Sequence, residues 1–122
     1  MKLSKYIDGA KSLEALAGLK TPASVTWKVA MAITKAQEHI KLFDQAKNTT
    51  VANLADKDAD GNPLIVNGHY QFTEHALAFR QEMSDLLNQD VPEPLKISIA
   101  EFKDLPIEGS ILLPLMDWLI VA

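Results

Sequence analysis

The residues with the clearest potential for chemistry are three aspartates at alternate positions, Asp56, Asp58 and Asp60, followed by a glycine. Such a spacing opens the calcium loop of an EF-hand, where carboxylate oxygens converge on a hard cation. The second half of that loop is missing, because the glutamate expected at its twelfth position is Asn67. Two alternatives remain, a weak cation-binding regulatory module and a polar turn in which the aspartates bond to nearby backbone amides. The polar turn is the commoner role for such residues.

Other side chains with catalytic or metal-binding chemistry are sparse. His69 and His75 follow the acidic loop, but their spacing matches no standard transition-metal site. None of the six serines stands in a nucleophile elbow, no glycine-rich phosphate loop occurs, and cysteine is absent. An active site built from residues distant in the sequence would leave no local pattern. We therefore expect a protein that is not an enzyme, with no catalytic residues, no cofactor and no tight metal site.

The composition is that of a folded domain with uneven charge. Hydrophobic residues make up 48% and charged residues 23% of 122 residues, and the net charge is −4. Residues 1–55 carry eight lysines against four acids, whereas residues 56–122 carry four basic residues against twelve acids. Arginine leads most nucleic-acid contacts, and Arg80 is the one arginine. Nucleic-acid binding through Lys28, Lys35 and Lys41 is therefore the weaker alternative.

No segment has the pattern of a membrane span or a secretion signal. The apolar run over residues 111–122 is short and is interrupted by Pro114 and Asp117. Residues 1–16 lack the continuous apolar stretch of a signal peptide. We expect a soluble protein with no membrane partner.

Apolar residues at helical spacing predict two N-terminal helices. The first covers about residues 3–17, and the second runs from Thr21 to about Lys47, with Val51 and Leu54 extending it towards Ala55. The link between them is short, which favours a helical hairpin.

The remaining elements are shorter. Asn67–Gly68 is the signal for a two-residue turn between strands at 64–66 and 69–72. A third helix follows from a cap at Thr73, then a strand over residues 95–100, then a short terminal helix capped by Ser110. The sequence thus predicts a single α+β domain over residues 1–122.

Two kinds of side chain are candidates for a partner surface. Trp27 and Met31 lie on the long helix, and tryptophan and methionine are enriched at the centres of interfaces, although they are more often core residues. Asp85, Asp90 and Glu93 belong to the acidic half and could form an electrostatic face. A helix longer than the body on which it packs also leaves apolar surface to be covered, by its own chain or by a second copy.

In this order, the elements resemble those of a group of small, mostly uncharacterised proteins encoded by tailed bacteriophages and prophages. The resemblance rests on the link Leu19–Pro22, the segments Asp58–Asn62 and Gly68–Phe72, the helix end Glu82–Asn88, the strand Leu95–Phe102 and the terminal Leu115–Leu119. It implies a small accessory protein of the cytoplasm of the bacterial host, or of the virion. Its partner would be a phage structural protein or a host factor that it inhibits. It implies no catalytic or ligand-binding residue.

Overall fold

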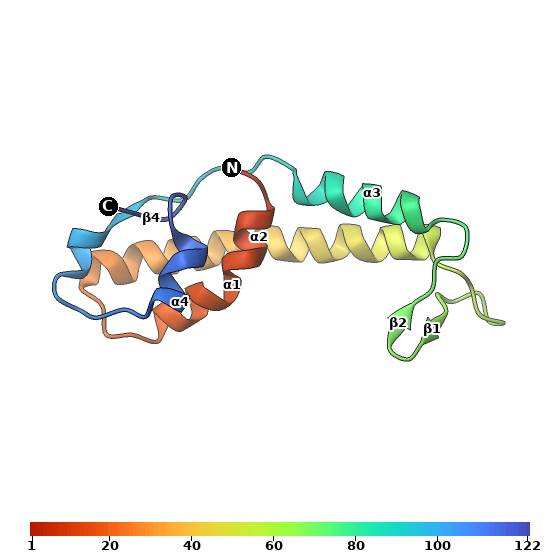
Figure 1. Cartoon of the computed structure of the whole chain (residues 1–122), viewed down its shortest axis with the longest axis horizontal. Helices are drawn as coiled ribbons and strands as arrows, with labels where there is room; N and C mark the ends of the chain where they lie inside the picture. The colour runs from red at the N-terminus through yellow and green to blue at the C-terminus, as the bar shows by residue number, and fades with distance from the viewer. The chain divides into compact units, whose positions relative to one another are not determined.

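The computed structural model describes residues 1–122 and divides them into two compact units. The first unit combines Met1–Ile40 with Asp90–Ala122, and the second is Lys41–Gln89. Four α-helices, an antiparallel strand pair and a parallel strand pair make up the chain, so the predicted α+β class is confirmed (Figure 1). The division into two compact units does not test whether the chain is a single domain, so that prediction stays a prediction.

The first two helices follow the predicted apolar stripes. α1 is Ser4–Ala17 and α2 is Ala23–Leu54, so the second helix takes the extension beyond Lys47. α2 contributes its residues up to Ile40 to the first unit and the remainder to the second. Both helices bury the residues that recur every three or four positions, which is the spacing of one helix face. These buried residues are Tyr6, Leu13, Leu16, Val25, Val29, Ala32 and Ala36.

The C-terminal segment closes the core of the first unit. It lies beside α1, as the blue and red ribbons show in Figure 1. Its elements are the strand β3 (Ile97–Ser98), the 3-10 helix η1 (Ile99–Phe102), the helix α4 (Gly109–Leu112), the 3-10 helix η2 (Leu113–Leu115) and the strand β4 (Ile120–Val121). β3 pairs in parallel with β4, with Ile97 opposite Ile120. Both isoleucines are fully buried, and Phe102, Leu115, Trp118 and Leu119 are buried with them.

Two predictions for this segment were wrong in their bounds. The strand expected over residues 95–100 stops at Ser98, because Ser98 and Glu101 form a capping box that starts η1. The terminal helix begins at Gly109, with Glu108 rather than Ser110 at its N-cap. The chain then leaves helical geometry before β4, where Asp117 adopts a left-handed backbone conformation (φ 73°) that a short polar residue tolerates.

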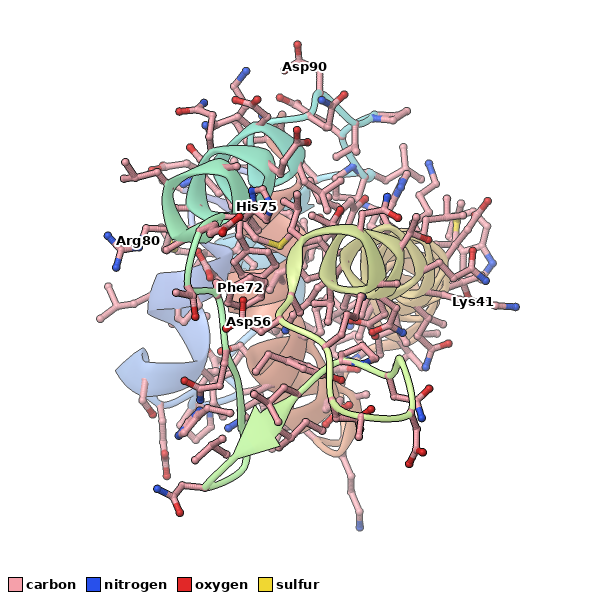
Figure 2. All side chains as sticks on the ribbon, turned by 90° about the vertical axis from the view of Figure 1, so that its right-hand side faces the viewer. Lys41, Asp56, Phe72, His75, Arg80 and Asp90 are labelled. Atoms are coloured by element: carbon pink, nitrogen blue, oxygen red, sulfur yellow. The ribbon has the colours of Figure 1, made fainter.

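The second unit contains the predicted hairpin and the third helix. β1 (Ile65–Val66) pairs antiparallel with β2 (His69–Tyr70), with Val66 opposite His69. Asn67 and Gly68 between them have φ values of 53° and 79°, as a type I′ turn requires. The third helix, α3 (Ala76–Leu87), runs alongside the C-terminal part of α2 (Figures 1 and 2).

Thr73 does not cap α3, so that prediction was wrong. The helix begins at Ala76 after His75, and the Thr73 hydroxyl donates instead to the carboxylate of Asp56. The core of this unit is thin: Val51 and Ala55 are its buried hydrophobic residues, and α3 contributes no fully buried side chain.

Candidate interaction surface

Two of the three aspartates of the acidic loop, Asp56 and Asp58, accept hydrogen bonds through their carboxylates. Asp58 Oδ1 accepts from the backbone N–H of Asp60 at 2.9 Å and of Asn62 at 3.0 Å. Asp56 accepts from the backbone N–H of Thr73 at 3.0 Å and from its hydroxyl. No group of three or more histidine, aspartate or glutamate side chains in the chain is placed to hold a metal ion. Of the two alternatives for this loop, the polar turn is the one whose expected hydrogen bonds, from backbone N–H groups to aspartate side chains, are observed.

Asp56 connects the end of α2 to the segment before α3. Figure 2 shows it close to Phe72, whose ring stacks on Phe79 of α3 with centroids 4.2 Å apart. The hydroxyl and the N–H of Thr73 lower the pKa of Asp56, and the charge of His75 adds to this effect. The carboxylate therefore serves as an anion that orders the chain around it.

The three acids predicted for a partner surface each have a partner within the chain. Asp90 forms an ion pair with Lys2 at 3.1 Å, and Glu93 one with Lys96 at 3.5 Å. Asp85, which lies in the second unit, accepts a hydrogen bond from a glutamine one turn earlier in α3. Each of the three acids is thus bonded to a residue of its own unit.

Trp27 and Met31, in contrast, lie together on the face of α2 that points away from the core of the first unit. The Trp27 side chain is 59% exposed, and Met31 is half-buried. Beside them lies a shallow, open hollow of about 270 Å³. The residues that line this hollow are Trp27, Ala30, Met31, Thr34 and Lys35. Their spacing of three, four, seven and eight positions places all five on one helix face. We refer to these five residues as the Trp27 face.

The Trp27 face exists because the opposite side of the same helix supplies the core. Val25, Val29, Ala32 and Ala36 are buried there, about half a turn away from Trp27. The chain's second tryptophan is placed differently. Trp118 is 5% exposed, and its ring N–H donates to the carbonyl of a proline at 2.8 Å.

The make-up of the hollow suits a side chain from another protein better than a small molecule. A ligand pocket encloses most of its ligand, whereas a hollow lined by a single helix leaves its occupant open on one side. The Thr34 hydroxyl already donates to the Ala30 carbonyl at 3.0 Å. Lys35 is the one charged group in the lining, and no nucleophile lies next to a base.

The borders of the Trp27 face are an ion pair and a second hollow. Lys28 Nζ lies 2.7 Å from Glu101 Oε1, with about three-quarters of each side chain buried. The Lys28 hydrogen bond, and then the N–H of Ser98, lower the pKa of Glu101, which favours its carboxylate form. A hollow of about 220 Å³ shares Ala30 with the Trp27 face and continues over Ile33 towards α1.

The sequence analysis named Trp27 and Met31 as partner-surface candidates; it did not name Ala30 or Thr34, and it named Lys35 only for nucleic-acid binding. Ala30, Thr34 and Lys35 carry no partner-surface signal of their own, since small, polar and charged residues are ordinary on an exposed helix. Once a helix is assumed, the positions three to eight residues after Trp27 identify them. Nothing in the sequence distinguished an exposed Trp27 from a buried one.

The chain matches no family model, no curated protein and no solved structure.

None of its helices combines the length and the apolar character needed to cross a membrane.

Proposed function

We propose that the protein acts through protein–protein contact and not through catalysis, with the Trp27 face as its contact surface. The observation that carries the proposal is the exposure of Trp27 beside a hollow that could receive a partner's side chain. An aromatic side chain presents about 150–250 Å² of surface, so 59% exposure leaves roughly 90–150 Å² in water. At about 25 cal/mol per Å², covering it would contribute roughly 2–4 kcal/mol, which is the range of an interface hot spot.

The setting of this contact follows from the resemblance alone. We extend the proposal to a phage accessory protein in the cytoplasm of its bacterial host or in the virion. Its partner would then be a phage structural protein, in particle assembly, or a host factor that it inhibits. Cation binding is less well supported, because Asp56 and Asp58 already accept hydrogen bonds from their own chain.

The proposal is tested by affinity purification of the tagged chain from phage-infected cells, with Trp27→Ala as the variant. A matched control is Leu113→Ala, because Leu113 is a large hydrophobic residue of the same unit that is 74% exposed. Both side chains are exposed, so both variants should stay within about 0.5 kcal/mol of the wild type in stability.

We expect one or more proteins to be enriched with the wild type and with Leu113→Ala, and to be lost with Trp27→Ala. Calorimetry with the purified partner should give the same order of affinity. Retention of every partner by Trp27→Ala would refute the Trp27 face as the contact surface.

A further inference from the structure

We propose that the Trp27 face binds the same face of a second copy of this chain, with the two α2 helices antiparallel about a two-fold axis at Met31. This inference rests on the proposed function, since it names a partner for the same surface. It is carried by the shape and the charges of that surface, and the area of the surface sets the strength of the pairing.

The shape of the Trp27 face is complementary to itself. The exposed indole of Trp27 and a shallow hollow that it lines together with Ala30, Met31 and Thr34 lie on one helix. A two-fold axis requires each copy to offer both halves of the contact, and this face does. With the axis at Met31, Trp27 lies four residues before it and meets the position four residues after it on the second copy. That position is Lys35, at the far end of the hollow, so each indole would enter the hollow of the other copy.

The charges favour the same arrangement. Lys35 takes part in none of the ion pairs within the chain, and its ammonium would lie against the indole of the second copy, an attractive contact. Glu38 is exposed and likewise outside those ion pairs. It lies seven residues after Met31, so it would face Ser24 of the second copy, in the first turn of α2. That turn holds no acidic residue of its own, and a negative charge there is stabilising.

A parallel pairing would lose these contacts. Each residue would then meet its own equivalent, which places Lys35 against Lys35 and Glu38 against Glu38. Like charges at such positions repel, and the indoles would meet each other instead of the hollows. The surface therefore discriminates between the two orientations.

The area of the face sets the strength of the pairing. From Ser24 to Glu38 the helix rises by roughly 21 Å. A standard stable interface buries about 800 Å² on each partner, which is more than one face of a helix segment this short provides. We therefore expect a weak dimer in the micromolar range, governed by protein concentration.

Cysteine cross-linking on the full chain tests the axis directly, because the protein has no cysteine of its own. In Met31→Cys the two thiols would meet on the axis, and oxidation by diamide should join two copies through one disulfide. In Thr34→Cys the two thiols would be offset by about 9 Å along the antiparallel helices, beyond the reach of a disulfide. Leu113→Cys, exposed but elsewhere on the same unit, controls for random collision.

We expect a dimer on a non-reducing gel for Met31→Cys, formed at least tenfold faster than for the other two variants. Equal cross-linking of Met31→Cys and Thr34→Cys would overturn the antiparallel axis. Equal cross-linking of all three would mean collision alone and would overturn the interface.

The second measurement is the oligomeric state by sedimentation velocity, on the wild type and on variants that contain no introduced cysteine. The wild type and Leu113→Ala should shift from monomer towards dimer as concentration rises to about 1 mM, whereas Trp27→Ala and Lys35→Glu should remain monomers. A wild type that stays monomeric throughout overturns this inference. The proposed function would still stand if Trp27→Ala then lost a different partner in the affinity purification. Conversely, a Trp27-dependent dimer with no other Trp27-dependent partner would keep the inference and reject a phage or host partner on this face.

Discussion

Replacing Gly9 by alanine sets helix propensity against packing in the core of the first unit. Gly9 lies inside α1, where an alanine is usually more stable by about 1 kcal/mol. A Cβ atom at this position would lie 2.7 Å from Cζ2 of Trp118 and 3.2 Å from Cδ2 of Leu115. The first distance is shorter than van der Waals contact allows, so either the ring or α1 must move.

The ring of Trp118 has little freedom to move. It is buried, its N–H donates to the Pro114 carbonyl at 2.8 Å, and it packs edge-on against Tyr6 with centroids 5.4 Å apart. Overpacking of a well-filled core costs about 1–3 kcal/mol. Subtracting the gain in helix propensity leaves an expected net loss of about 1 kcal/mol for Gly9→Ala.

Urea unfolding at neutral pH measures this difference, with Gly18→Ala as the matched control. Gly18 lies at the C-cap of α1 with φ −79°, and the nearest atom to its added Cβ would be 3.5 Å away. That substitution fits without strain, so it should be neutral or stabilising by up to about 0.5 kcal/mol through the unfolded chain. If Gly9→Ala proved as stable as Gly18→Ala or more so, the close approach of α1 to Trp118 would be refuted.

Two further predictions concern carboxylates whose pKa is lowered in the folded protein. Glu101 contributes stability that is present above its ordinary pKa of 4.5 and is lost as the pH falls through its lower folded pKa. Glu101→Gln should therefore flatten the decline in stability below about pH 4.5 in acid unfolding, and an unchanged slope would contradict a role for the Lys28 pair. Asp56→Ala should speed amide hydrogen exchange at Thr73 and in α3 by removing the carboxylate that binds Thr73, while α1 exchanges as before. Asp44→Ala, an exposed change on α2, is the control, and equal exchange in the two variants would count against the Asp56 contacts.

Local signals were sufficient for the hairpin of the second unit and for α1 and α2. The turn signal of Asn67–Gly68 predicted the hairpin correctly, because only a few residue types readily adopt the positive φ values of this turn. The start of α3 was wrong for an equally local reason. Thr73 has the chemistry of a cap, but it lies within reach of Asp56, seventeen residues earlier in the chain, and bonds to that side chain instead.

The pairing of β3 with β4 shows where local signals end. Each strand is two residues long, and Ile97 and Ile120 meet only because α1 and α2 leave one apolar site for both. Neither segment carries a sequence signal for a parallel pair. The two strands lie far apart in the sequence, so no repeating pattern of apolar residues connects them.

The sequence by itself determined the α+β class, the long stripe of α2, the hairpin turn and the absence of cysteine chemistry, because all of these are properties of neighbouring residues or of composition. Only the tertiary structure decided that Trp118 is buried and Trp27 exposed. Both tryptophans stand in apolar surroundings in the sequence, and the side of a helix that is covered depends on what packs against it. The C-terminal segment and α1 cover the far side of α2 from Trp27, and so they leave the indole and its hollow exposed.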